Sequence, residues 1–144
     1  MQDIIIGSDH RGFELKQKVK EYLREKKHFF IDVGCNNTER VDFPAVAREV
    51  VDVVTSARHF CGIMVCGSGF GVGIAANRYK GIRAVHCLTP EMARRAREHN
   101  DANVLCLAAE GADFENIKKT INAFLNTKFL PDERYKRRNE MLDK

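Results

Sequence analysis

The run Gly62-Ile63-Met64-Val65-Cys66-Gly67-Ser68-Gly69-Phe70-Gly71 decides the fold class of this 144-residue chain. Its apolar beginning predicts a buried strand, its glycines predict a tight loop, and residues 72–77 predict the start of a helix. A glycine loop between a strand and a helix turns backbone N–H groups toward one small space, where they can hold an anion. We therefore expect this segment to bind a group that is, or becomes, negatively charged.

Short apolar runs alternate with amphipathic stretches on both sides of this segment. The pattern predicts strands at residues 4–6, 29–33, 62–65, 84–88 and 104–107, and helices at residues 13–26, 44–54, 72–77, 90–98 and 117–125, with a charged helical tail from residue 132. Five strand–helix repeats without a linker predict a single α/β domain over residues 1–144, with a parallel sheet covered on both faces.

Composition narrows the classes of function. The 24 basic and 20 acidic residues leave a net charge of +4, which is too balanced to indicate nucleic-acid binding by itself. No apolar stretch is long enough to span a bilayer, and residues 1–4 have no signal-peptide character. The five cysteines form no Cys-x-x-Cys pair, so we expect a reduced, cytoplasmic protein without membrane contact.

Ligands of parallel sheets lie at the carboxyl ends of the strands. This rule groups Ser8-Asp9-His10, which follows the first predicted strand, with the loop that begins at Cys66. The segment His99-Asn100-Asp101 either lies near the same edge or is brought there by a partner subunit.

The glycines of the loop match neither common phosphate-loop pattern. The dinucleotide fingerprint requires a glycine where Val72 stands, and the Walker lysine and hydroxyl are missing. A structural turn that packs a helix on the sheet is the alternative. Four alternating glycines, at residues 67, 69, 71 and 73, exceed what packing requires, so we favour a functional loop.

Cys66 opens the glycine loop, where backbone donors favour a thiolate that can act as a base or a nucleophile near neutral pH. A free cysteine is more often a small buried hydrophobe. We expect that role for Cys61, Cys87 and Cys106, which lie in apolar runs, whereas the role of Cys35 stays open.

Other polar residues also allow two interpretations. Asp9 either caps the next helix or, with His10, grips hydroxyl and phosphate groups at the rim. His99 either stabilises its helix end as a cation or serves as a general acid–base group. Arg134 and Arg138 share a helix face, which either is simply solvated or clamps one phosphate.

Several blocks of residues together resemble the ribose-5-phosphate isomerase B family over nearly the whole chain. The blocks are Gly-Ser-Asp-His at 7–10, Thr-Glu-Arg-Val-Asp-Phe-Pro at 38–44, Cys-Gly-Ser-Gly at 66–69 continuing to Ala-Ala-Asn at 75–77, Gly-Ile-Arg-Ala at 81–84, and His-Asn-Asp-Ala-Asn-Val at 99–104. The resemblance implies a Rossmann-like three-layer fold with a five-stranded parallel sheet. It also implies a homodimer or a dimer of dimers with shared active sites, a C-terminal helix that reaches toward the partner subunit, and neither a metal nor an organic cofactor.

The resemblance further implies an aldose–ketose isomerase that interconverts ribose 5-phosphate and ribulose 5-phosphate through a cis-enediolate, within the pentose phosphate pathway. In that case Cys66 moves the substrate proton, His99 assists ring opening, and the Ser68 hydroxyl helps the loop amides. The implied substrate-binding residues are Asp9, His10, Gly67, Gly69, Phe70, Gly71, Asn100, Arg134 and Arg138.

Three residues depart from the family pattern. Glu110 stands where many members carry a phosphate-contacting arginine, so either this carboxylate points away or other arginines compensate. Tyr135 replaces a histidine, and Phe43 replaces a frequent tyrosine.

Three alternatives stay open. One is an isomerase of a six-carbon sugar phosphate, such as allose or galactose 6-phosphate, although the segment His99-Asn100-Asp101 resembles that of the five-carbon enzymes. Another is a flavodoxin-like domain that binds a nucleotide or flavin phosphate, against which the missing dinucleotide spacing argues. The third is a non-catalytic relative that regulates or pairs with an active subunit, against which the retention of Cys66, Asp9 and His99 argues.

Overall fold

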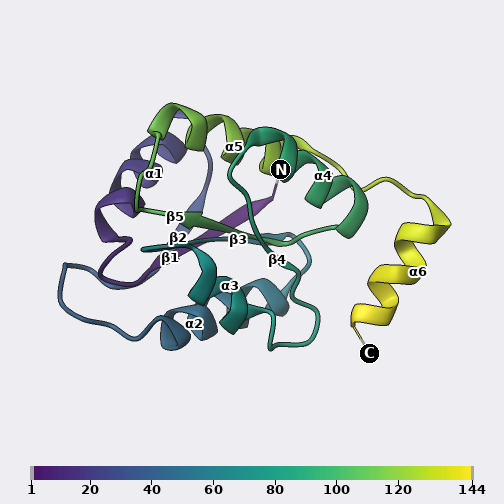
Figure 1. The fold of residues 1–144 in the computed structure, drawn as a ribbon, viewed down its shortest axis with the longest axis horizontal. Helices are drawn as coiled ribbons and strands as arrows, with labels where there is room; N and C mark the ends of the chain where they lie inside the picture. Colours follow the sequence, from purple (N-terminus) through teal and green to yellow (C-terminus); the bar gives the residue numbers. More distant parts are fainter. Residues whose placement is uncertain (1, 144) are drawn as a thin grey trace.

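The computed structural model describes residues 2–143 and confirms the predicted parallel α/β fold. The middle layer is a five-stranded parallel sheet in the spatial order β2-β1-β3-β5-β4. Figure 1 shows this sheet between two layers of helices. Its strands are β1 (Asp3–Ser8), β2 (Phe30–Gly34), β3 (Phe60–Cys66), β4 (Ala84–His86) and β5 (Val104–Ala108).

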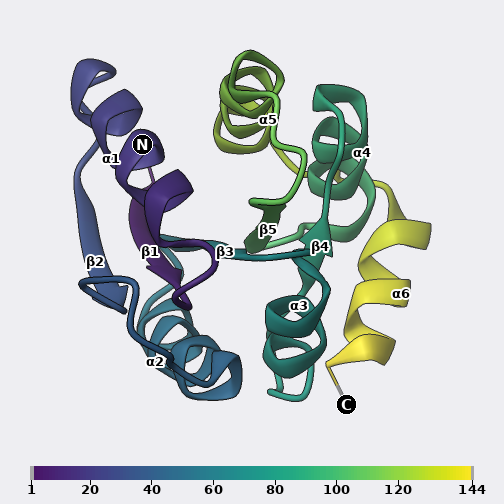
Figure 2. The same cartoon turned by 60° about the vertical axis from the view of Figure 1, so that its left-hand side comes forward.

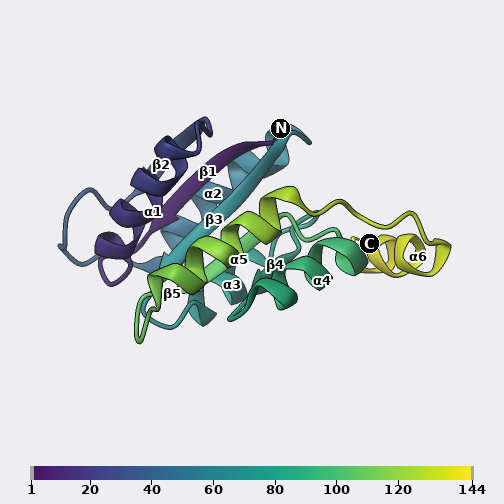
Figure 3. The same cartoon turned by 90° about the horizontal axis from the view of Figure 1, so that it is seen from above.

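The amphipathic helices cover both faces of the sheet. One face carries α1 (Phe13–Glu25), α4 (Pro90–Asn100) and α5 (Phe114–Asn126), and the other carries α2 (Phe43–Ser56) and α3 (Phe70–Ala76). The last helix, α6 (Glu133–Leu142), does not cover the sheet. It lies beyond α4, at the side of the molecule where β4 is the edge strand (Figures 2 and 3).

Two helix starts that the sequence predicts from a proline are confirmed. Thr89 Oγ1 accepts a hydrogen bond from the Met92 N–H group at 3.2 Å, and Pro90 is the first residue of α4. Pro44 likewise lies in the first turn of α2. These starts matter for function because they fix where each strand-to-helix loop ends.

The fourth strand is shorter than predicted. It ends at His86, so the strand prediction was wrong for residues 87 and 88. This edge strand pairs only with β5, and its ladder stops where His86 lies opposite Cys106. Leu88 is exposed, and its carbonyl accepts from the Asn116 side chain, so the chain has left the sheet before Thr89 caps α4.

Strand register brings distant loops to one edge of the sheet. Ser8 is paired with Val65 at the end of β1 and β3, and Cys66 is paired with Ala108 at the end of β5. The residues that follow Ser8, Cys66 and Ala108 therefore leave the sheet side by side. This edge holds the candidate functional site.

A buried lysine connects α1 to β2 at the same edge of the sheet. The Lys16 side chain, on α1, is completely buried, and its Nζ donates to the carbonyl oxygens of Val33 at 2.9 Å and Cys35 at 2.7 Å. It also pairs with Asp32 at 2.8 Å. Partial burial raises the pKa of Asp32, but the bonds from Lys16 and Lys20 outweigh it, so the net shift is downward. The ammonium group thus ties α1 to β2 and to the segment after it.

Replacing Lys16 should show how much these contacts contribute to the stability of the protein. Lys16→Met removes the lysine donor from a buried carbonyl group and from a partly buried one, so we expect it to lower the free energy of unfolding by about 2–5 kcal/mol. Lys20→Met is the matched control, because Lys20 bonds to the same Asp32 carboxylate near the surface and should cost at most about 1 kcal/mol. Urea unfolding curves measure both, and equal losses would contradict the special role of Lys16.

Candidate active site

Cys66 lies at the end of β3 with its sulfur turned toward the glycine loop. The Gly69 N–H group donates to Cys66 Sγ at 3.0 Å. The residue is 5 % exposed, so the sulfur is shielded from bulk water but held by a main-chain dipole. The backbone donor therefore fixes the direction in which the sulfur points.

Gly69 can make this contact only as a glycine. Its φ of +78° is in the left-handed region. A Cβ at this position would also lie 2.5 Å from Cδ2 of His86, at the end of β4. The His86 ring packs edge-on against Phe70 at 4.8 Å, and burial lowers the pKa of this histidine. The glycine loop therefore packs against a neutral His86 imidazole.

The Ser68 hydroxyl closes the next turn of the loop. Ser68 Oγ accepts from the Phe70 N–H group at 3.2 Å. Two of the amides predicted to face substrate, those of Gly69 and Phe70, are thus engaged by Cys66 and Ser68 in this structure. These two N–H groups thus orient the Cys66 and Ser68 side chains, which we expect to act on substrate.

Three other cysteines behave as buried hydrophobes, as predicted. Burial raises the pKa of Cys61 to about 12 and that of Cys87 to about 11, and it also raises the pKa of Cys106. Cys35 is buried as well, with its sulfur 3.6 Å from Ser8 Oγ. Cys66 is the one cysteine of the five that lines the cavity described next.

A cavity of about 360 Å³ opens over Cys66. Six of the residues predicted to act in the site line it together, from the loops after β1 and β3: Asp9, His10, Cys66, Gly67, Ser68 and Gly71. Gly69 and Phe70 are not among the lining residues. The rule that ligands gather at the carboxyl ends of parallel strands is followed here.

Asp9 and His10 are held in place by main-chain groups. Asp9 Oδ1 accepts from the N–H groups of Arg11 and Gly12, each at 3.0 Å, so the carboxylate shapes the turn before α1. His10 Nδ1 accepts from the Val41 N–H group at 3.3 Å. A neutral imidazole that accepts at Nδ1 carries its proton on Nε2, which makes that nitrogen a donor.

Two of the three departures from the family pattern also lie in this cavity. Glu110, after β5, forms an ion pair with Arg11, a residue that sequence reasoning did not single out. The Glu110 N–H group donates to the Gly67 carbonyl at 3.0 Å, and its carboxylate lies against Gly67, at the start of the glycine loop. Phe43 also lines the cavity, and its ring would lie 3.2 Å from a Cβ on Gly71.

The remaining predicted residues lie elsewhere in the chain. His99 and Asn100 end α4, shortly before β5 begins, and so they lie at the amino edge of the sheet rather than with Cys66. Arg134 and Arg138 lie on α6. None of these four residues lines the cavity over Cys66.

Tyr135, the third departure, joins α6 to α4. Its ring stacks on His99 with centroids 4.5 Å apart. Arg134 is bound by both oxygens of Asp132, at 3.1 and 3.0 Å, whereas exposed Arg138 forms no ion pair with any residue in 2–143. The two arginines therefore face solvent on one helix beside the predicted histidine.

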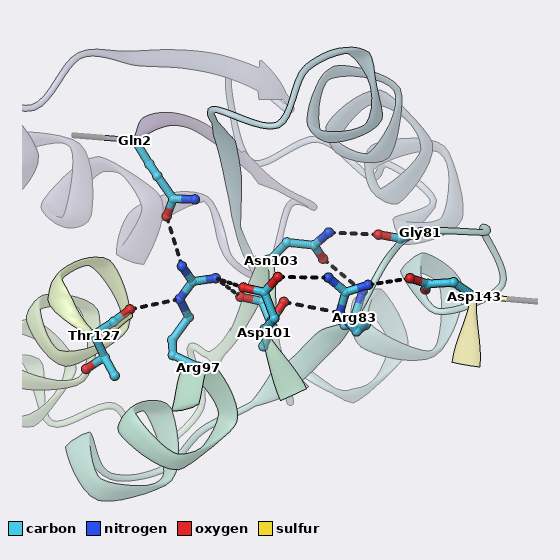
Figure 4. Close-up of polar contacts among 9 residues, drawn as sticks. Gln2, Gly81, Arg83, Arg97, Asp101, Asn103, Thr127 and Asp143 are labelled. Atoms are coloured by element: carbon cyan, nitrogen blue, oxygen red, sulfur yellow. Dashed lines mark hydrogen bonds and ion pairs between the residues drawn. The ribbon is translucent and has the colours of Figure 1, made fainter. Parts of the chain in front are cut away.

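Arg83 fastens the ends of these two helices, as Figure 4 shows. Its guanidinium donates to Asp143 Oδ2 at 2.8 Å, to Asp101 Oδ2 at 3.3 Å and to the Asp101 carbonyl at 3.2 Å. Asp101 has a left-handed φ of +45° and also accepts from Arg97 at 3.4 Å. The residues on α4 and α6 are thus held as one unit, separate from Cys66.

A larger cavity, of about 770 Å³, lies beside this arginine network. Arg83, Asp101, Asn139 and Asp143 are among the residues that line it, and none of the predicted site residues does. The smaller cavity is the candidate active site because it combines a thiol, an imidazole and a glycine loop.

Two structural features are absent from residues 2–143. No group of three or more His, Cys, Asp or Glu side chains there is arranged to hold a metal ion. None of the helices in that range has both the length and the apolar character needed to cross a membrane.

Two features of the structure favour glycine at position 69: its left-handed backbone conformation and the close approach of His86. A comparison of two glycine substitutions should separate their contributions to stability. Gly81 also has a left-handed φ, of +80°, but a Cβ there would meet nothing within 4 Å. We expect Gly81→Ala to cost about 1 kcal/mol of stability through the backbone alone. Gly69→Ala should cost about 2–4 kcal/mol, because the methyl group also displaces His86. Urea unfolding measures both values, and equal losses would show that His86 does not confine the loop.

Comparison with known proteins places this geometry in a family. The model of the Ribose/Galactose Isomerase family matches residues 4–142. The chain is 39 % identical to the ribose-5-phosphate isomerase B of Escherichia coli over 129 residues, which cover 90 % of this chain and 87 % of that protein. It is 34 % identical to a galactose-6-phosphate isomerase subunit of Clostridium acetobutylicum, over 89 % of this chain and 74 % of that one.

Solved structures agree with the sequence comparison. The crystal structure of a ribose 5-phosphate isomerase from Thermotoga maritima superimposes with a TM-score of 0.95 and 45 % identity, covering 99 % of this chain and 97 % of the other. The type B ribose 5-phosphate isomerase of Trypanosoma brucei gives a TM-score of 0.92 at 37 % identity, over 99 % and 97 % of the two chains. The chain therefore belongs to the ribose/galactose isomerase family.

Proposed function

We propose that this protein is an aldose–ketose isomerase that interconverts ribose 5-phosphate and ribulose 5-phosphate, with Cys66 as the base. The observation that carries the proposal is the Gly69 N–H group bound to Cys66 Sγ inside a cavity that His10 and Ser68 also line. Relatives whose names state this activity support the choice of a five-carbon substrate.

The reaction moves one proton between neighbouring carbons. Cys66 Sγ takes the proton from C2 of the open-chain aldose, and the electron pair of that C–H bond forms the double bond of a cis-enediolate. The negative charge then rests on the carbonyl oxygen. The sulfur returns the proton to C1, and the proton of the C2 hydroxyl passes to the oxygen on C1, so the ketose is formed with atoms and charge balanced.

The loop lowers the barrier by stabilising the growing charge. Main-chain donors near the oxygen, together with the Ser68 hydroxyl, are suited to the enediolate, and losing one such donor typically costs about 10²–10³ in rate. Asp9 faces the same cavity and is suited to bind sugar hydroxyls. The His10 Nε2 donor is suited to the phosphate, whose binding energy orients the reacting carbon.

The site needs a second subunit to be complete. His99, Asn100, Arg134 and Arg138 lie away from the Cys66 cavity, and α6 stands beside the sheet rather than on it. A homodimer in which each chain supplies this group to its partner's cavity brings ring-opening and phosphate-binding side chains to the thiol. An isologous contact of this kind produces two equivalent sites.

Exposed apolar side chains provide a surface for such a dimer. Phe70 and Ile74 on α3 are 60 % and 68 % exposed, and Leu88 and Met92 near the start of α4 are 59 % and 43 % exposed. Figure 2 shows α3 and α4 flanking β4, on the side of the molecule that carries α6. Covering these side chains with a second copy would bury apolar area beside both halves of the site.

Removing the thiol tests the proposed base. Cys66→Ala should lower kcat for ribose 5-phosphate by about 10²–10⁴ while KM changes little, because the substrate contacts remain. Cys35→Ala is the control, since it removes a buried thiol that does not line the cavity. Turnover assays with ribose, allose and galactose phosphates also identify the substrate, and near wild-type turnover by Cys66→Ala would refute the assignment.

Mixing two inactive variants tests the shared site. One variant carries Cys66→Ala and the other carries His99→Ala with Arg138→Ala. Random mixing by refolding makes half of the dimers hybrid, and each hybrid has one intact site, so about a quarter of wild-type activity should return. If both halves of a site come from the same chain, mixing restores no activity.

A further inference from the structure

The cavity over Cys66 is lined by more carboxylates than lysine or arginine side chains within residues 2–143. Its lining includes the carboxylates of Asp9, Asp42 and Glu110, whereas Arg11 is the one lysine or arginine side chain on it within residues 2–143. A phosphate monoester carries about two negative charges at neutral pH. The anion therefore needs a cation on this side of the site, and Arg11 is the one that the chain supplies.

The ion pair of Arg11 and Glu110 is seated on the glycine loop. A Cβ on Gly67 would lie 2.9 Å from both Arg11 Nε and Glu110 Oε1. Gly67 does not have a positive φ, so glycine at this position is explained by the approach of the pair and not by the backbone conformation. The guanidinium consequently lies directly beside the residue that follows Cys66.

Both partners of the pair are anchored through their main chains. The Arg11 N–H group donates to Asp9 Oδ1 at 3.0 Å, and the Glu110 N–H group donates to the Gly67 carbonyl at 3.0 Å. Their side chains are 60 % and 58 % exposed, so solvent screens the pair and its own contribution to stability is small. A guanidinium has more donors than one carboxylate oxygen uses, and phosphate is the stronger acceptor.

We infer that Arg11, oriented by Glu110, binds the phosphate of the substrate together with His10. In the absence of substrate, the ion pair with Glu110 holds the Arg11 guanidinium against Gly67. When substrate binds, the phosphate accepts hydrogen bonds from the guanidinium N–H groups that Glu110 does not use. The carboxylate also lowers the affinity for the anion, because it lies next to the bound charge. Arg11 and Glu110 are thus a substrate-binding residue and its positioning residue. The inference rests on the proposed function for the identity of the ligand as a sugar phosphate.

The first test compares binding of ribose 5-phosphate with binding of unphosphorylated ribose by calorimetry, alongside steady-state kinetics. Arg11→Met should raise Kd and KM for ribose 5-phosphate about five- to tenfold, leave kcat within about twofold, and leave the affinity for ribose unchanged. The effect should shrink at high salt, because the group is exposed. Arg48→Met is the matched control, since Arg48 is an exposed arginine paired with Asp52 away from the cavity.

The second test removes only the negative charge of the pair. Glu110→Gln keeps an oxygen that accepts from the guanidinium but removes the negative charge beside the phosphate. It should therefore tighten ribose 5-phosphate binding about two- to threefold, both in the wild-type background and beside Arg11→Met. A Glu110→Gln variant that does not bind ribose 5-phosphate more tightly would overturn the repulsive role of Glu110. Unchanged phosphate binding in Arg11→Met would overturn the role of Arg11.

These outcomes are separable from those of the proposed function. If the wild type binds ribose 5-phosphate without isomerising it, and Arg11→Met weakens that binding selectively, the proposed function is wrong and the inference stands. If turnover is normal in Arg11→Met and the variant only unfolds at lower urea concentration, the pair has a purely structural role and the inference is refuted.

Discussion

The hydrogen bond from the Gly69 N–H group to Cys66 Sγ is the contact on which the site depends. It requires a left-handed residue at the end of a strand, and a neutral imidazole beneath that residue leaves no room for a side chain. The His86 ring reaches this place only because β4 pairs with β5, which in turn pairs with β3. The surroundings of one sulfur atom are therefore set by the register of three strands.

Local patterns were sufficient to predict the layers of the fold and half of the site. Apolar periodicity identified the strands and helices, because each buries one face, and threonine and proline at residues 89–90 identified a helix start. The carboxyl-end rule then grouped Asp9 and His10 with Cys66, and the structure places them on one cavity. The error at residues 87 and 88 arose because apolar character continues after an edge strand has lost its partner.

Pairings between distant residues could not be predicted. Arg11 and Glu110 are 99 positions apart, and exposed charges carry no periodic signal that would join them. Lys16 looks like any solvated lysine on an amphipathic helix, because its burial depends on where β2 ends. The prediction left open whether His99 shares the edge of Cys66, since a helix end can lie at either side of the sheet, and the start of β5 decides it.

The five cysteines of this fold differ in how accessible their thiols are to a small molecule. All five cysteines are buried, yet only Cys66 combines a cavity wide enough for a small organic molecule with a main-chain donor at its sulfur. A mild electrophile should consequently label one position and spare the other four, whose thiols are packed among side chains. A folded chain should therefore take up one label and an unfolded chain up to five, so the label incorporated per chain reports how much of a preparation is folded.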